Sequence, residues 1–195
     1  MNSLVAFEAI LAVSCLISVY LAREAFFPAS IFWAFGASTF CFAAVLGGLN
    51  AAGYVTVESY HTTAEYFAGS LGLVAFALGA VSGLFAEIVS RFWWWILLAL
   101  TIILSIVLVL GTWHFGADIQ KIVVGVIFLI GLVRLISSGM IAVYLLLGVV
   151  CLVLSDFADG WIAVNTGMQA ANIFHVLLSL AIVSFGLSAS RDNWE

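Results

Sequence analysis

Seven long apolar segments, separated by short polar connections, run through almost the whole chain and constrain its fold more than any other feature. A helix that crosses a bilayer needs about 20 mainly apolar residues. None of the segments shows the two-residue alternation of a transmembrane β-strand. The pattern therefore predicts an all-α, polytopic seven-helix bundle in a cell membrane. The expected helices are about 3–22, 29–50, 62–86, 92–112, 119–136, 139–155 and 169–189.

Composition supports lipid as the solvent of this chain. Of its 195 residues, 66% are hydrophobic and 8% are charged, whereas soluble domains have about 45–50% and about 25%. A soluble fold of this size leaves roughly a third of its chain surface exposed to water. Seven membrane-spanning helices with short connections account for nearly all of the chain, so we expect residues 1–195 to form a single transmembrane domain. No basic region precedes the first apolar segment, which we interpret as a retained helix.

The charged residues limit the partners. The net charge is −5, and the five basic residues are scattered, so they do not form the basic surface that nucleic-acid binding requires. We expect membrane lipid, and a small solute, as the partners. The cysteines lie inside apolar segments without CxxC spacing and are interpreted as small buried hydrophobes.

The basic residues also predict an orientation. With seven spans, Arg23, Arg91, Arg134 and Arg191 fall on one side of the membrane, and Lys121 falls on the other. The positive-inside rule then places the N-terminus outside and the C-terminus in the cytoplasm.

Small residues recur along the segment 62–86. Gly72, Gly79 and Gly83 lie on one stripe, and such stripes let another helix approach closely. The partner helix is in the same chain or in a second copy, so a homo-oligomer through this stripe is one expectation.

Polar residues gather in the expected outer half of the bundle. A charge at the bilayer centre costs at least about 2.5–3.5 kcal/mol and usually faces the bundle interior. We expect Glu8, Glu65 and His175 to be the deepest and to line one outward-facing pocket, whereas His61 and His114 are interpreted as solvated. The candidate pocket residues are Glu8, His61, Glu65, Asn172, His175 and Ser179.

Three functions remain open at this point, and the sequence leaves undecided whether the protein is an enzyme. The pocket binds or transports a small solute, a lipid headgroup or a proton. Alternatively, His61, Glu65 and His175 hold a catalytic zinc, which takes three protein ligands and a water, although no HExxH motif is present. In the third alternative the chain is an accessory subunit of a membrane complex.

The segment Asn172-Ile173-Phe174-His175-Val176-Leu177-Leu178-Ser179 resembles the last-helix histidine segment of the seven-helix alkaline ceramidase and adiponectin-receptor superfamily. The resemblance implies a zinc-dependent amide hydrolase with an intramembrane site and His175 as a ligand. Only these eight residues carry it. The second histidine of the family pattern is missing, since Ala171 and Ser179 flank His175 at four residues. A retinal cofactor is excluded, because the last segment lacks a lysine.

Overall fold

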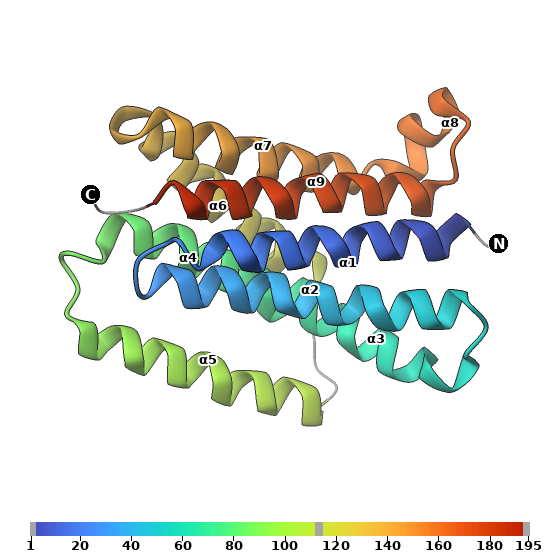
Figure 1. Ribbon diagram of the computed structural model, residues 1–195, viewed down its shortest axis with the longest axis horizontal. Helices are drawn as coiled ribbons and strands as arrows, with labels where there is room; N and C mark the ends of the chain where they lie inside the picture. Colours follow the sequence, from blue (N-terminus) through green and yellow to red (C-terminus); the bar gives the residue numbers. More distant parts are fainter. Residues whose placement is uncertain (1–2, 112–114, 193–195) are drawn as a thin grey trace.

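The structure is a computed structural model that describes residues 3–111 and 115–192, and every regular element in those ranges is helical. A 3₁₀ turn, η1 (Val55–Val57), and two π-helical turns, η2 (Ala68–Gly72) and η3 (Ala158–Ile162), join some of the helices. The helices are α1 (Ser3–Ala22), α2 (Ala29–Ala51), α3 (Glu58–Phe67), α4 (Leu73–Phe85), α5 (Arg91–Gly111), α6 (Ala117–Ser137), α7 (Gly139–Ser155), α8 (Ala163–Thr166) and α9 (Ala170–Ser190) (Figure 1).

The prediction of an all-α chain with several membrane-spanning helices agrees with the structure. By length and composition, six helices in the described ranges can cross a membrane, with Val55–Phe85 counted as one. The count of seven depends on α7, which has 17 residues. It reaches spanning length only together with Ala158–Thr166, which follows after a bend of 53°.

The predicted start of the third helix, at residue 62, is wrong. The helical stretch already begins with η1, and α3 starts at Glu58. The polar residues before position 62 ended the apolar pattern but did not end the helix. Thr62 and Thr63 donate hydrogen bonds to carbonyl oxygens one turn earlier, which satisfies their hydroxyl groups inside the helix.

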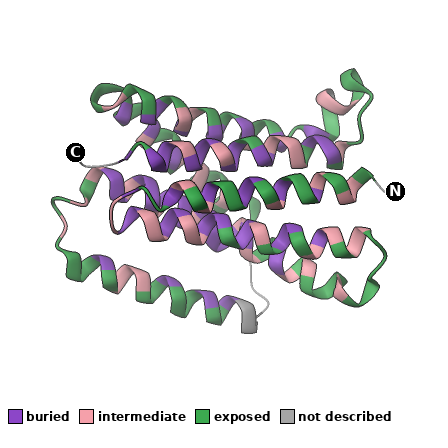
Figure 2. Cartoon of the chain, in the orientation of Figure 1, coloured by how far each residue is buried: buried purple, intermediate pink, exposed green. Residues whose placement is uncertain are grey.

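The helices pack around a small aromatic core. α1 lies beside α2 and α9, and α7 lies beside α9 on the other side, whereas α5 stands at the edge of the bundle (Figure 1). Trp33, Phe76 and Phe185 are nearly fully buried, with ring centroids 5.1–5.8 Å apart. Buried residues line the inward faces of the helices and exposed ones cover the outward faces (Figure 2), as expected of helices surrounded by lipid.

The glycine stripe of the third segment packs inside the chain. A Cβ on Gly72 would collide with the side chain of Thr39, and one on Gly79 would lie 2.8 Å from the indole of Trp33, both on α2. These two glycines therefore allow α4 and η2 to approach α2 closely. The homo-oligomer through this stripe stays a prediction, and the packing within the chain does not support it.

The two ends of the bundle differ in charge. The end of α1, the start of α5 and the end of α9 lie together (Figure 1); we call this the arginine end, after Arg23, Arg91 and Arg191. The start of α1, α3, α8 and the start of α9 lie at the opposite end. We call it the acidic end, after Glu58 and Asp159.

Candidate functional site

The buried carboxylate of Glu8 meets His175 between α1 and α9. Glu8, Leu11, Cys15 and Ser18 recur every three or four residues and form the buried face of α1, which packs against α9. Glu8 Oε1 lies 3.0 Å from His175 Nε2, and the two side chains are only 5% and 13% exposed. A pair buried this far is shielded from bulk water, so its electrostatic interaction is strong.

The other ring nitrogen of His175 contacts a backbone carbonyl group. Nδ1 lies 2.5 Å from the carbonyl oxygen of Ala171. A carbonyl oxygen only accepts hydrogen bonds, so Nδ1 is the donor and carries a hydrogen. Nε2 then faces the Glu8 carboxylate. One proton held between them would make the pair either an imidazolium with a carboxylate or a neutral imidazole with a carboxylic acid.

His61 and Glu65 extend this pair toward the surroundings. They lie four residues apart on α3, with 3.5 Å between His61 Nε2 and Glu65 Oε1. A Cβ placed on Gly47 of α2 would overlap the Glu8 carboxylate and lie 2.7 Å from His61 Nε2. Glu8 and His61 therefore face each other across Gly47, close enough for one water to bridge them. We call these four titratable residues the Glu8–His175 cluster.

Exposure changes in steps along the cluster. The side chain of Glu65 is 57% exposed and that of His61 is 17% exposed, whereas Glu8 is 5% exposed. Glu65 also lies near enough to His175 to act on it electrostatically. Glu65 is thus more exposed than Glu8 and His175, with which it was grouped, and His61, which was expected to be a solvated loop residue, is partly buried. His61 is partly buried because α3 begins at Glu58 and holds it inside a helix, not in a connection.

Asn172 and Ser179 lie on the same helix as His175 and are both buried. Asn172 Nδ2 donates a hydrogen bond to Ser3 Oγ at 3.3 Å. Within the described residues, Asn172 Oδ1 and Ser179 Oγ have no hydrogen-bond partner. Buried polar atoms are nearly always paired. Asn172 Oδ1 can therefore accept a hydrogen bond from a water or a bound solute, and Ser179 Oγ can donate or accept one.

Gly47 is the residue of the site that sequence reasoning missed. It lies in α2 near the end that faces α3, and it is buried. The consecutive glycines Gly47 and Gly48 were the only available signal. Which of them faces the carboxylate follows only from how α2 packs on α1.

The metal interpretation finds no support in the geometry. Across residues 3–111 and 115–192, no three His, Cys, Asp or Glu side chains are placed to hold one ion. This includes the expected set of His61, Glu65 and His175. His114 lies outside the described residues.

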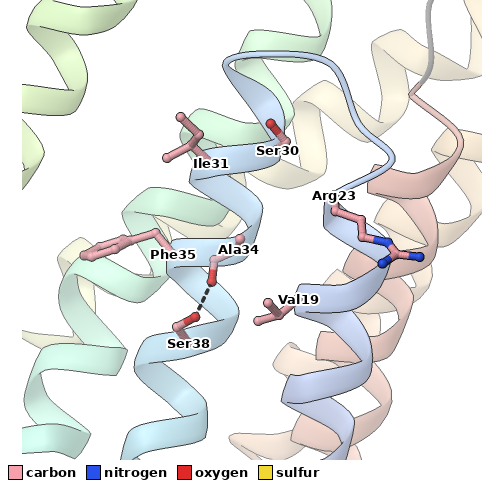
Figure 3. A pocket seen from close by; sticks show the side chains of 7 residues that line it. All are labelled: Val19, Arg23, Ser30, Ile31, Ala34, Phe35 and Ser38. Carbon is pink, nitrogen blue, oxygen red and sulfur yellow. Dashed lines mark hydrogen bonds between the residues drawn. The ribbon is translucent and has the colours of Figure 1, made fainter.

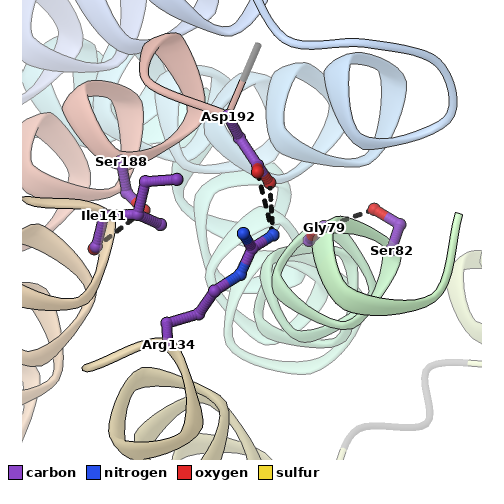
Figure 4. Close-up of polar contacts among 6 residues, drawn as sticks. All are labelled: Gly79, Ser82, Arg134, Ile141, Ser188 and Asp192. Atoms are coloured by element: carbon purple, nitrogen blue, oxygen red, sulfur yellow. Dashed lines mark hydrogen bonds and ion pairs between the residues drawn. The ribbon is translucent and has the colours of Figure 1, made fainter. Parts of the chain in front are cut away.

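A second buried pair lies at the arginine end and was also missed. Arg134 Nη2 on α6 donates to both carboxylate oxygens of Asp192, at 2.8 and 3.0 Å (Figure 4). The side chains are 8% and 9% exposed, and both overlap the position of a Cβ on Gly83 of α4. Burial raises the pKa of Asp192 above its ordinary value, and the Arg134 guanidinium opposes part of that rise. The sequence pattern had indicated only an interfacial arginine at 134.

Comparison with known proteins returned no match to a protein-family model, a curated protein or a solved structure. The resemblance of residues 172–179 to the ceramidase superfamily therefore stays a prediction. The function has to be argued from the cluster itself.

Proposed function

We propose that this chain is a multi-pass protein of the cell membrane that binds and carries a proton, or a small solute coupled to it, at the Glu8–His175 cluster. The acidic end faces outside in this proposal, because the arginine end then lies on the cytoplasmic side as the positive-inside rule requires.

One observation carries the proposal: the buried carboxylate of Glu8 lies 3.0 Å from Nε2 of His175, whose Nδ1 contacts the carbonyl oxygen of Ala171. Ionisable groups inside membrane spans are costly and mark ion and proton pathways. Histidine is the side chain whose protonation most readily changes near neutral pH. The arrangement can thus exist with its proton held or released, which is what a proton-coupled carrier needs.

The rest of the cluster supports exchange with the outer side. Glu65 is exposed, His61 is partly buried, and Glu8 is buried. Groups that alternate between acid and base in this order can pass a proton inward, with a water between His61 and Glu8. The exposed acids Glu58 and Asp159 at the same end raise the local concentration of cations, so we expect a solute that is neutral or positively charged.

Proton uptake into proteoliposomes tests the proposal. The purified protein is reconstituted into vesicles that contain a pH-sensitive dye, and a potassium diffusion potential is applied with valinomycin. We expect faster acidification than in protein-free vesicles. Glu8→Gln and His175→Gln should each reduce the rate to that of protein-free vesicles, because each removes one partner of the shared proton.

The matched control is Glu87→Gln, which removes an exposed carboxylate after α4 that is not part of the cluster. It should leave the rate unchanged. Equal rates for wild-type protein and Glu8→Gln would overturn the proposal. Stoichiometric zinc in the purified protein, lost in His175→Ala, would also overturn it, in favour of a metal-dependent hydrolase.

A further inference from the structure

A groove between α1 and α2 lies away from the Glu8–His175 cluster, toward the arginine end. Its volume is about 460 Å³. Side chains from both helices line it: Val19, Arg23, Ser30, Ile31, Ala34, Phe35 and Ser38 (Figure 3).

The walls of the groove are apolar. Val19 on α1 and Ile31, Ala34 and Phe35 on α2 supply hydrocarbon surface. The hydroxyl group of Ser38 donates a hydrogen bond to the carbonyl oxygen of Ala34 at 2.7 Å, so it needs no polar occupant. Along α2 the groove extends from Ser30 to Ser38, about 12 Å at 1.5 Å per residue. Such a cleft in the outer surface of membrane helices suits an alkyl chain.

The end of the groove beside the α1–α2 connection is polar and carries a cation. Arg23 follows the last residue of α1, is exposed, and holds its guanidinium group 3.6 Å from the ring centroid of Tyr20. In Figure 3 this group is directed away from Ile31 and Phe35, outward from the apolar wall. Ser30, in the first turn of α2, adds a hydroxyl donor.

A second cation lies near the same connection but does not line the groove. The guanidinium of Arg91 is 5.0 Å from the ring centroid of Phe27, which precedes α2. Glu24 is exposed beside Arg23, and Glu87 is exposed four residues before Arg91. Of these four charged residues only Arg23 lines the groove. Arginines over aromatic rings are typical of the membrane interface, where lipid phosphates lie.

We propose that this groove binds one acyl chain of an anionic phospholipid, with its phosphate on Arg23. The apolar walls accept the chain, the Arg23 guanidinium donates hydrogen bonds to the phosphate oxygens, and its positive charge selects an anionic headgroup. The site lies in the leaflet at the arginine end and does not depend on the function proposed for the Glu8–His175 cluster.

The lipid that the purified protein retains tests this proposed binding site directly. The protein is reconstituted with equal amounts of phosphatidylglycerol and phosphatidylcholine, extracted in mild detergent, and examined by native mass spectrometry. We expect the wild-type protein to retain one phosphatidylglycerol in preference to phosphatidylcholine. Arg23→Gln should lower that preference about fivefold, the effect of one basic residue near an anionic lipid surface.

Two further variants distinguish lipid binding in the groove from a general electrostatic attraction of anionic lipid to this end of the bundle. Arg91→Gln removes a cation at the same end that does not line the groove, and it should lower the preference less than Arg23→Gln does. Ala34→Trp fills the groove and should reduce the retention of both lipids while Arg23 is intact. Circular dichroism verifies that each variant is folded.

Equal lipid preference in wild-type protein and Arg23→Gln would overturn the proposal, and this variant changes only an exposed side chain. The proposal would also fail if Ala34→Trp abolished a dimer and left lipid retention unchanged. In that case the groove would bind a second copy of the chain.

Discussion

At the scale of residues, glycines determine where the charged groups of this protein can lie inside the bundle. Gly47 leaves space for the Glu8 carboxylate and the ring of His61, and Gly83 leaves space for the Arg134–Asp192 pair. Glycine has no Cβ, so a polar side chain can lie directly against the helix backbone. Glu8 and His61 come from α1 and α3, whereas Arg134 comes from α6 and Asp192 from the segment after α9.

Replacing Gly47 should disturb the cluster far more than replacing its neighbour. In Gly47→Ala the new Cβ overlaps the Glu8 carboxylate, whereas in Gly48→Ala it meets Glu8 Cβ at 3.5 Å, an ordinary contact. We expect Gly47→Ala to lower stability by about 1–3 kcal/mol, the usual cost of overpacking, and to slow proton uptake. Thermal unfolding in detergent and the vesicle assay measure the two effects; equal behaviour of the two variants would contradict this geometry.

Removing one partner of the Arg134–Asp192 pair should be costly. Arg134→Met leaves a buried carboxylate without its partner, and breaking a buried pair in this way costs about 3–5 kcal/mol. The double variant Arg134→Met with Asp192→Leu leaves no unpaired charge and should be close to wild type in stability. Chemical denaturation in mixed micelles gives both values. A double variant less stable than Arg134→Met would show that the ion pair itself provides the stability.

The pH dependence of stability should report the burial of Asp192. Burial raises the pKa of Asp192 in the folded protein, so the folded state takes up a proton at a pH at which the unfolded chain is still ionised. The stability that this group contributes is therefore full below its ordinary pKa and is lost as the pH rises through the raised value. Asp192→Asn should remove this dependence, measured by unfolding at several pH values, whereas the exposed Asp156→Asn should retain it.

At the scale of elements, apolar segment length predicts the helices well, because each long apolar segment forms one helix or one nearly continuous helical stretch. Most helix ends differ from the predicted ones by one or two residues. The start of α3 differs from the predicted one because the polar residues before position 62 are already helical. The sequence also indicated the polar face of Asn172, His175 and Ser179, which follows from helical spacing. The spacing could not show which helix faces His175 or that Arg134 reaches Asp192, because such pairs depend on packing between distant segments.

Close approach of α4 to α2 should depend on Gly79. A larger side chain there would have to displace the buried indole of Trp33, whereas Gly125 on α6 has no atom within 4 Å of its Cβ position. We expect Gly79→Leu to lower stability by about 1–3 kcal/mol or more, and Gly125→Leu to have little effect. A thermal shift assay on both variants tests this, and equal melting temperatures would contradict the packing.

At the scale of the whole molecule, the proposed orientation gives the protein an acidic outer end and a basic inner end. Glu58 begins α3 at the acidic end, and Glu87 follows α4 at the arginine end. In intact cells, a membrane-impermeant thiol reagent should label Glu58→Cys and should not label Glu87→Cys until the cells are permeabilised. The reverse labelling pattern would show that the protein has the opposite orientation in the membrane.

The proton shared by Glu8 and His175 is the central claim, and nitrogen NMR of ¹⁵N-histidine-labelled protein in lipid tests it most directly. The account predicts that His175 keeps its Nδ1 hydrogen at every pH and that its Nε2 signal reports a hydrogen bond to a carboxyl group, which disappears in Glu8→Gln. A His175 signal that is unchanged in Glu8→Gln would show that the two side chains do not share a proton.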